Sequence, residues 1–329
     1  MAAGLLPRGR RALPCVVALL HASPADALPP APSIHPAIRQ LMAKHDPILL
    51  YASRLLPPAA AADAAALYAW CRRLDELVDD PAADWSARRA RLDEWEARLA
   101  ALCAGSPRDE FDGALLATLR RHPSLGVQPF TDMLDGMRAD SVEARRVASH
   151  AELEEYAYQV AGTVGLMLLP LLGVHAADEM ARAREPAVAL GKAIQLVNIL
   201  RDARADAALG RIYLPQDEMA ALGVREEDVL ACRGTAEYCS LVARKAARAE
   251  ALLKEAEVGG RNLPGLGPLL VAVIVELYRD YLVVLARRGY DNLDMGGHDR
   301  VSISTARKVL ATLRALLSVA RPTKAPTES

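Results

Sequence analysis

Residues 195–206 read QLVNILRDARAD, and four polar side chains in this stretch recur at intervals of three, four and four positions. These side chains are Gln195, Asn198, Asp202 and Asp206. Because residues three and four apart share a face of an α-helix, the spacing predicts a helix with one polar stripe. We expect this helix to begin near Pro186, since proline is favoured in the first helical turn.

A second stretch, residues 68–80 (YAWCRRLDELVDD), has the same feature, because Asp75 and Asp79 are also four positions apart. Tyr68 and Arg72 continue this face of the predicted helix. The other faces are apolar and would hold the helix in a bundle, through Leu67, Trp70, Leu74, Leu77 and Val78. The sequence therefore predicts two helices that each carry a pair of carboxylates.

Like charges at positions i and i+4 destabilise an isolated helix by about 0.2–0.5 kcal/mol per pair, so a compensating cation is expected. Magnesium suits this role, since it takes carboxylate oxygens and bridges one or two carboxylates to substrate phosphates. Mg²⁺, or Mn²⁺ in its place, would neutralise the charge that develops on a departing diphosphate. The alternative is that the carboxylates are solvated or pair with nearby arginines, namely Arg72, Arg73, Arg201 and Arg204.

The composition of the 329-residue chain favours helices throughout. Ala, Leu, Arg and Glu are abundant, and their straight or short side chains lose little rotamer freedom in a helix. Pro and Gly divide the chain into segments of about 15 to 25 residues, and none has the uninterrupted apolar length of a membrane-spanning helix. We predict an all-α fold.

The first 35 residues differ from those that follow. Arg8, Arg10 and Arg11 precede a short apolar run, and no acidic residue occurs before Asp26. This composition indicates a targeting peptide, with a disordered N-terminal segment as the alternative. At the other end, residues 321–329 form a polar tail.

The charge balance argues against a nucleic-acid partner, because 40 basic residues nearly cancel 41 acidic ones. Five scattered cysteines without CxxC or Cys/His spacing support neither a disulfide framework nor a zinc site. An anionic ligand would therefore be bound by a local cluster of charges.

Four blocks in this order resemble the signature segments of phytoene and squalene synthases. They are residues 68–80, 128–140 (QPFTDMLDGMRAD), 156–165 (YAYQVAGTVG) and 195–218 (QLVNILRDARADAALGRIYLPQDE). The resemblance extends from about His45 to Lys308. The sequences RRLDELVD, QPFTDMLDGMR and GRIYLPQDE resemble phytoene synthases more than squalene synthases.

The resemblance implies a single isoprenoid-synthase helical bundle over residues 36–320, with a central active-site cavity. It implies a Mg²⁺-dependent transferase (prenyltransferase) of carotenoid biosynthesis that joins two geranylgeranyl diphosphates head to head. The product would be phytoene, formed through prephytoene diphosphate with release of diphosphate. Alternatives are a squalene or dehydrosqualene synthase that uses farnesyl diphosphate, and a non-catalytic helical assembly factor derived from the same fold.

The location follows from the resemblance and the leader together. We expect a plastid (chloroplast) protein, with a bacterial-type cytoplasmic protein as the alternative. Peripheral membrane association is expected because the substrates are amphiphiles and the product is an oil. The sequence does not specify an oligomeric state.

The resemblance also assigns roles to individual positions. It assigns metal binding to Asp75, Asp79, Asn198, Asp202 and Asp206. It assigns substrate binding to His45, Tyr68, Arg72, Gln195, Asn198, Arg201, Arg211, Tyr213 and Arg300. Tyr156 and Tyr278 join the four aspartates as catalytic positions, although a core aromatic role is the alternative for the tyrosines.

Two further segments carry expectations. The glycines of residues 160–165 either widen a tunnel for a prenyl chain or let two helices approach closely, and the two interpretations are compatible. The family's His-Ser-x-Ser-Phe block is replaced by His45-Asp46-Pro47-Ile48-Leu49. Asp46 therefore adds a negative charge where a diphosphate is expected.

Overall fold

The computed structural model describes residues 33–46, 50, 53, 56–78, 84–296 and 298–320. The all-α prediction is confirmed for these residues, which contain no β-strand beyond an isolated bridge between Arg146 and Ile212. The chain divides into two compact units, Met1–Ser141 and Val142–Ser329.

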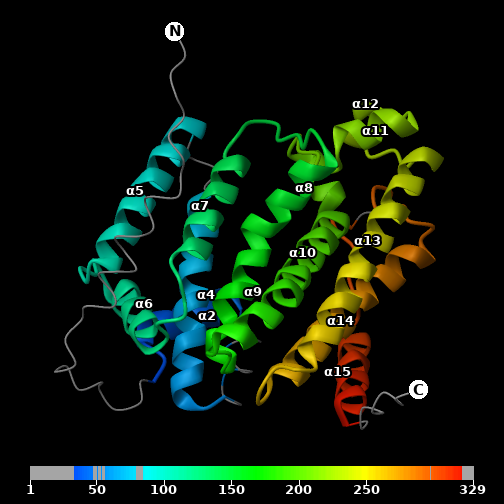
Figure 1. Cartoon of the computed structure of the whole chain (residues 1–329). Coiled ribbons are helices and arrows are strands. Elements are labelled where there is room, and N and C mark those ends of the chain that lie inside the picture. The colour runs from blue at the N-terminus through cyan, green and yellow to red at the C-terminus, as the bar shows by residue number, and fades with distance from the viewer. Residues whose placement is uncertain are drawn as a thin grey trace, which may run out of the picture. The chain divides into compact units, whose positions relative to one another are not determined.

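The first unit is built around α4 (Pro58–Val78), the helix that carries Asp75 (Figure 1). Around it pack α2 (Pro36–His45), α5 (Trp85–Cys103), α6 (Glu110–Arg121) and α7 (Gln128–Asp140). Most of the predicted apolar face is buried, with Leu67, Trp70, Leu74 and Val78 at most 5% exposed. Trp70 links α4 to α5 and α7, because its ring centroid lies 5.4 Å from that of Trp95 and 5.6 Å from that of Phe130.

A buried carboxylate fixes α4 against α6. Asp63 is 2% exposed and accepts hydrogen bonds from Thr118 Oγ1 (2.9 Å) and Arg121 Nε (3.0 Å), and His122 Nε2 lies 2.8 Å away. Burial alone would raise the pKa of Asp63, but the hydrogen bonds from His122, Arg121 and Thr118 hold it below its ordinary value. A carboxylate satisfied this fully is tolerated in a core.

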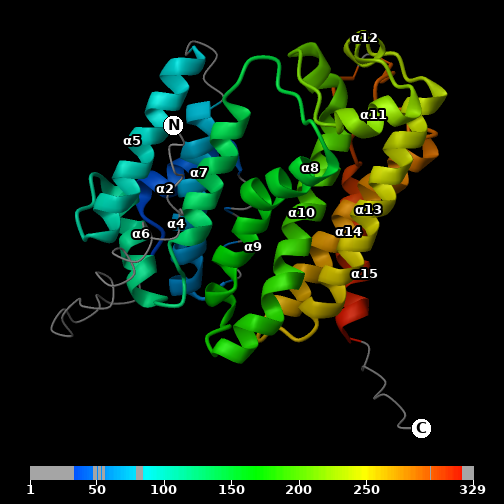
Figure 2. The same ribbon diagram turned by 45° about the horizontal axis from the view of Figure 1, so that its top comes forward.

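The second unit is organised around α10 (Ala177–Ala208), which packs along α13 (Ala236–Gly260) (Figures 1 and 2). The other elements are α8 (His150–Ala157), a π-helical turn η3 (Tyr158–Gly162), α9 (Thr163–Leu168), a 3-10 turn η4 (Pro170–Leu172), α11 (Gln216–Leu222), α12 (Glu226–Leu230), α14 (Gly267–Arg287) and α15 (Thr305–Ala320). α10 also contacts η3, α9, α8 and α14, so it is the central helix of this unit.

The expected start of the stripe helix near Pro186 is wrong, because α10 begins at Ala177 and Pro186 lies inside it. Proline lacks the amide that would bond to the carbonyl of Arg182, a residue on an exposed part of the helix. The proline ring also fits against Gly259 of α13, where an added Cβ would lie 2.1 Å from Cγ of Pro186. Glycine at 259 thus accommodates a proline that would otherwise favour a helix boundary.

Glycines bring α10 into backbone contact with the η3–α9 segment. A Cβ added to Gly191 would lie 2.2 Å from the carbonyl oxygen of Ala161, and one added to Gly165 would lie 2.3 Å from that of Ala187. Both separations are far inside the ~3.5 Å of an ordinary non-bonded contact. The close-approach interpretation of the 160–165 segment is therefore confirmed for Gly165, and the tunnel interpretation stays a prediction.

This contact makes a stability prediction. Gly191→Ala should lower the free energy of unfolding by about 1–3 kcal/mol, because the new methyl group overlaps the Ala161 backbone. Gly113→Ala on α6 is the matched control, since a Cβ there meets nothing within 4 Å. The control should raise stability by roughly 0.5–1 kcal/mol. Urea unfolding followed by circular dichroism measures both, and equal stability of the two variants would contradict the packing argument.

Candidate active site

The predicted polar stripe lies on the second half of α10. Gln195, Asn198, Asp202 and Asp206 are each half-buried, whereas the apolar residues between the first three of them are core residues. Leu196, Val197, Ile199 and Leu200 are at most 5% exposed. Because these apolar side chains fix the rotation of the helix, the stripe is held at the edge of the core.

Asp202 is bound by arginine. Arg201 Nε donates to Oδ1 of Asp202 at 2.9 Å and Nη2 donates to Oδ2 at 2.6 Å, so the pair is bidentate. Arg300 Nε lies 3.7 Å from Oδ1 of the same carboxylate. The structure thus brings together three residues that were assigned from the sequence, and two of them are the cations expected for an anionic ligand.

Asn198 provides an unsatisfied oxygen on this stripe. Its Oδ1 is buried and has no hydrogen-bond partner among the described residues. A buried acceptor left unpaired costs about 1–3 kcal/mol, so such groups have a partner that is bound or have a functional role. An amide oxygen one helical turn from a carboxylate fits the preference of Mg²⁺ for oxygen ligands.

The metal assignment itself stays a prediction. Within the described part of the chain, acidic, histidine and cysteine side chains do not gather in groups of three or more that would hold a metal. Asp79, a predicted ligand, lies outside the described residues. Asp75 and Asp206 each have an interaction partner, so neither is an isolated charge.

Two predicted pocket tyrosines stack on each other. Tyr156 of α8 and Tyr213 have ring centroids 5.5 Å apart with an interplanar angle of 23°, and both are less than 10% exposed. The guanidinium carbon of Arg145 lies 5.9 Å from the Tyr156 ring. The sequence did not identify Arg145, because its position depends on a backbone hydrogen bond from Ile212 N to its carbonyl, at 3.0 Å.

A second aromatic pair lies beside the Arg201–Asp202 ion pair. Tyr278 and Tyr281 of α14 are one turn apart with ring centroids separated by 6.0 Å, and the guanidinium carbon of Arg201 is 5.8 Å from the Tyr281 ring. Burial raises the pKa of Tyr278, and the positive charge of Arg201 only partly offsets this. Tyr278 is therefore a neutral phenol at physiological pH. Tyr281 was missed, although its position three residues after Tyr278 was a signal.

Arg211, in the segment GRIYLP, is positioned by the C-terminal end of α10. Its backbone amide donates to the carbonyl oxygen of Asp206 at 2.8 Å, directly after the helix ends. Gly210 makes this turn with a positive φ of 72°. The turn therefore fixes Arg211 and then Tyr213 immediately beyond the polar stripe.

In the first unit, Glu76 connects two predicted substrate-binding residues. His45 Nε2 lies 2.9 Å from Oε1 of Glu76, and Arg72 Nε donates to the same oxygen at 3.3 Å. Glu76 was not identified from the sequence, although its spacing of four from Arg72 predicts such a pair. His45 is the last residue of α2, and Pro47, Ile48 and Leu49 lie outside the described residues.

Negative charge surrounds Tyr68 on the same helix. Burial raises the pKa of Tyr68, and Asp46, Asp75 and Glu76 raise it further against the opposing effect of Arg72. Asp46 thus adds negative charge near Tyr68, and its expected effect on a diphosphate stays a prediction. An excess of carboxylates at this end of α4 favours cations over anions.

The alternative role of the arginines holds only in part. Arg73 pairs with Asp109 at 2.8 Å, and Arg204 donates to the carbonyl of Leu293 at 2.6 Å, so both have structural partners. Arg201 does pair with Asp202, as that alternative expected. Local neutralisation thus accounts for Asp202.

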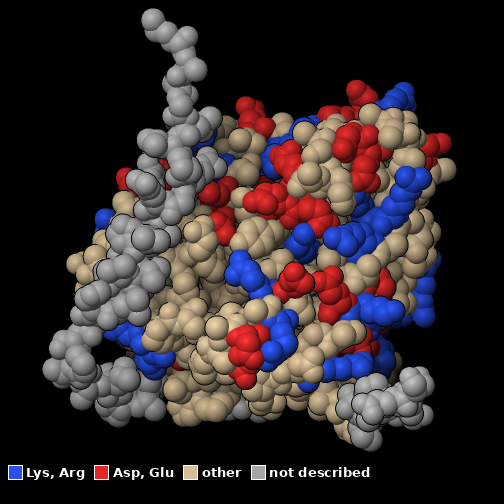
Figure 3. Space-filling view, in the orientation of Figure 1, with Lys and Arg blue, Asp and Glu red and all other residues tan. Residues whose placement is uncertain are grey.

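A surface network connects the helices that surround α10. Glu154 of α8 pairs with Lys192 of α10 and with Arg248 of α13, whose Nε lies 3.1 Å away. Burial raises the pKa of Glu154, but the two cations lower it to about 2. In Figure 3, acidic and basic side chains alternate over α8, α11 and α13, which agrees with the near-neutral net charge.

The squalene/phytoene synthase family profile matches residues 42–307 of the chain. The chain is 41% identical over 268 residues to phytoene synthase 3 (chloroplastic) of Zea mays, a match that covers 81% of this chain and 61% of the maize protein. It is 36% identical over 307 residues to 15-cis-phytoene synthase of Synechococcus elongatus, covering 91% and 97% of the two chains. The chain therefore spans about three fifths of the maize relative and nearly all of the cyanobacterial one.

Solved structures give the same result. A dehydrosqualene synthase bound to a ligand superposes with a TM-score of 0.74 at 30% identity, over 86% of this chain and 95% of that one. A squalene synthase of Alicyclobacillus acidocaldarius superposes with a TM-score of 0.67 at 27% identity, over 78% and 94% of the two chains. The helical bundle thus has the isoprenoid-synthase fold.

The chain belongs to the squalene/phytoene synthase family. Several of its curated relatives are named phytoene synthases, with identities between 36% and 45%.

The Arg201–Asp202 pair changes one expectation about stability. Because Asp202 is paired, Asp202→Ala should destabilise the metal-free protein instead of relieving a repulsion. A double-mutant cycle with Arg201→Gln should give a coupling free energy of about 1–2 kcal/mol, since both side chains are 22% exposed.

A matched pair on the same helix serves as the control. Asp178 and Arg182 are 70% and 69% exposed and should couple more weakly, because water and salt screen an exposed pair. Both cycles are measured by urea unfolding in the presence of a chelator. A coupling at Arg201–Asp202 no larger than that of the control pair would show that the ion pair contributes nothing special.

Proposed function

We propose that the protein condenses two geranylgeranyl diphosphates head to head to give phytoene and diphosphate, as a prenyltransferase. The observation that carries the proposal is the stripe on α10, where the unpaired amide oxygen of Asn198 lies one turn from the arginine-bound carboxylate of Asp202. The names of the relatives support the substrate, since they are phytoene synthases from plants and a cyanobacterium.

The proposed metal is Mg²⁺, with Mn²⁺ as a substitute. Its ligands in the proposal are Asp75, Asp79, Asn198, Asp202 and Asp206. When bound, the metal supplies positive charge that stabilises the departing diphosphate. The predicted role of Asn198 agrees with the fit of its free oxygen to a hard cation.

The arginines are proposed to bind the diphosphates. Arg201 and Arg72 each hold a carboxylate in the protein, Asp202 and Glu76, and a diphosphate offers the same kind of oxygen with a larger charge. Arg300, with a side chain 61% exposed, is free to turn towards an entering anion. Arg211 completes this set, beside the end of the stripe.

The tyrosines are proposed to act on the prenyl carbons. Departure of diphosphate leaves positive charge on the allylic carbon, and aromatic faces attract a cation by about 0.5–2 kcal/mol each. Tyr156 is buried and Tyr278 is half-buried, and both belong to this part of the second unit. Tyr213, which stacks on Tyr156, is proposed to help bind a diphosphate. Tyr68, His45 and Gln195 are proposed to contact the substrate as well.

A second candidate uses farnesyl diphosphate. Dehydrosqualene synthase, the protein of the solved structure with a TM-score of 0.74, is named for a shorter product, and its fold is the same. The two candidates share the stripe and differ in the length of the prenyl chain. Product analysis therefore distinguishes them.

We also propose that residues 1–35 are a plastid-targeting leader on a domain of residues 36–320. The names of the plant relatives support the plastid, and the cyanobacterial relative leaves the bacterial-type cytoplasmic alternative open. Ile34 is 7% exposed and packs with Ile38 and Met42, so removal of the leader is expected to end before Ile34 and not at residue 35. A fluorescent protein fused to residues 1–35 should accumulate in plastids, and diffuse cytoplasmic fluorescence would contradict the leader.

The activity is tested with the purified full chain, geranylgeranyl or farnesyl diphosphate, and Mg²⁺. Phytoene should form from geranylgeranyl diphosphate, and a chelator should abolish it. Asp75→Asn and Asp202→Asn should each lower kcat by roughly 10²-fold or more, because each removes charge where diphosphate departs.

The control for this test is Asp178→Asn, an exposed carboxylate on the same helix as Asp202. It should retain the activity of the unaltered protein. Formation of a squalene-type product alone would favour the second candidate. Full activity of the Asp202 variant at saturating Mg²⁺ would overturn the assignment of the stripe.

A further inference from the structure

Exposed apolar side chains are concentrated on the C-terminal helix, α15. Among the described residues, thirteen large apolar side chains are exposed, and six of them belong to this helix. They are Val309, Leu310, Leu313, Leu316, Leu317 and Val319, with exposures between 45% and 63%. The spacing of positions 309, 313, 316 and 317 places four of them on one helical face.

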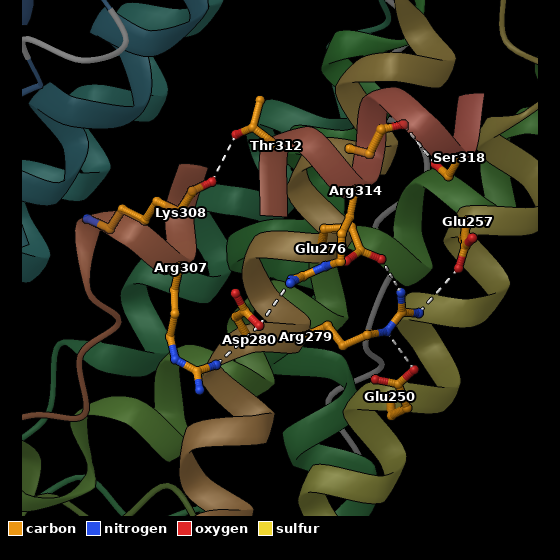
Figure 4. A network of polar contacts seen from close by, with 11 residues as sticks. Glu250, Glu257, Glu276, Arg279, Asp280, Arg307, Lys308, Thr312, Arg314 and Ser318 are labelled. Carbon is orange, nitrogen blue, oxygen red and sulfur yellow. Dashed lines mark hydrogen bonds and ion pairs between the residues drawn. The ribbon is translucent and has the colours of Figure 1, made fainter. Parts of the chain in front are cut away.

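The opposite face of α15 docks on α14 through small and charged residues. Ala311 and Ala315 are fully buried. Arg307 Nη1 lies 3.4 Å from Oδ1 of Asp280, and Arg314 Nη2 lies 3.1 Å from the same oxygen. Arg314 also pairs with Glu276, as Figure 4 shows. A surface helix normally buries its leucines and exposes its charges, and α15 does the reverse.

The docking is strong enough to hold the helix in this orientation. Glu276 also accepts from Arg279, which pairs in turn with Glu250 and Glu257 of α13, so the ion pairs join three helices (Figure 4). Asp280 is 4% exposed, and a buried carboxylate that lost its arginines would be costly. The leucine face is therefore presented outward by specific contacts on the other side.

We propose that this outward face of α15 inserts into the surface of an anionic lipid membrane, with the helix lying in the plane of the interface. The face consists of leucine and valine, and the helix contains no acidic residue. From Arg300 to Thr327 the sequence has no acidic residue. Arg300, Arg307 and Arg314 are paired with carboxylates elsewhere, so the basic residues left on and directly after α15 are Lys308, Arg321 and Lys324. Basic residues bordering an apolar helical face are typical of interfacial helices on anionic lipids.

The dimensions agree with a helix that lies on a membrane. At about 1.5 Å per residue, the 16 residues of α15 extend about 24 Å, less than the ~30 Å hydrocarbon core. More generally, the helices of the described residues all fall short of the length and apolarity needed to cross a membrane.

Two more exposed apolar side chains occur at the start of the helix on which α15 docks. The ion pairs of Arg307 with Asp280 and of Arg314 with Glu276 show that α15 runs antiparallel to α14. The end of α15 therefore lies beside the start of α14, where Leu266 and Leu270 are 52% and 41% exposed. A lipid surface tolerates such a spread of side chains, because it requires no complementary shape.

The inference rests on the proposed function in one respect, because that function requires a substrate to be taken from a membrane and a product to be returned to it. A substrate with long prenyl chains and a product without any polar group partition into lipid, since each buried CH₂ contributes about 0.8 kcal/mol. A helix that holds the protein at the interface brings the active site close to both.

Flotation of the full-length protein with vesicles tests the inference. The protein should float with phosphatidylcholine vesicles that contain phosphatidylglycerol and less with phosphatidylcholine alone. Leu313→Gln with Leu317→Gln should lower the partition coefficient at least about tenfold, since both side chains are more than half exposed and insert. Lys308→Gln should lower it about fivefold on anionic vesicles only.

The matched control removes two exposed apolar side chains of the same unit elsewhere, by Val142→Gln with Leu230→Gln. It should float as the unaltered protein does, and circular dichroism should show that both double variants are folded. Equal flotation of the Leu313/Leu317 variant and this control would overturn the inference. So would a concentration-dependent dimer in sedimentation that the same variant abolishes without a change in flotation, because the face would then bind a second copy.

Turnover in detergent micelles separates this inference from the proposed function. A chain that floats through α15 but makes no product in micelles would leave the inference standing and remove the function. A chain that makes phytoene in micelles but does not float would do the opposite.

Discussion

The backbone contact between α10 and the η3–α9 segment is the constraint on which the second unit depends. At Gly191 and Gly165, carbonyl oxygens occupy the space of a side chain, so the two segments have essentially one relative position. That position fixes the rotation of α10, and the rotation decides that Val197 and Leu200 are buried while Asn198 and Asp202 remain at the edge of the core. A cation requires its oxygen ligands at well-defined positions. Packed helices hold side chains at such positions more precisely than loops do.

Electrostatics then determines what the stripe can bind. Arg201 neutralises Asp202 in the protein, which removes much of the repulsion that the spacing of the aspartates suggests. Among the described residues, the buried oxygen of Asn198 has no hydrogen-bond partner, which costs free energy that a ligand would recover. The stripe therefore combines a carboxylate that is stable without a ligand with an amide oxygen that gains from one. In the first unit Glu76 has the corresponding role of holding a cation, Arg72, in place.

The helices, their apolar faces and the places of Asp75, Asp202 and Asp206 on them were predictable from the sequence, because they depend on local periodicity. The start of α10 was not, since Pro186 inside a helix is tolerated only through its contact with Gly259, which lies 73 positions later in the chain. Arg145 and Tyr281 were missed for the same reason, because their contacts with Tyr156 and Arg201 come from other elements. For Glu76, the pairing with Arg72 was predictable from their spacing of four residues. Its contact with His45 was not, because His45 belongs to another helix.

The C-terminal helix shows the limit of periodicity most clearly. A hydrophobic face at helical spacing predicts amphipathicity, but it does not specify whether the face is directed into the protein or away from it. The orientation of α15 is set by Asp280 and Glu276 of α14. These carboxylates pair with Arg307 and Arg314 and so turn the charged face of α15 towards α14. Ala311 and Ala315, both fully buried, allow the close approach that these ion pairs need. The leucines are thus exposed because the acidic partners are buried, and an apolar face held outward in this way is stable only at a cost that contact with another apolar phase would remove.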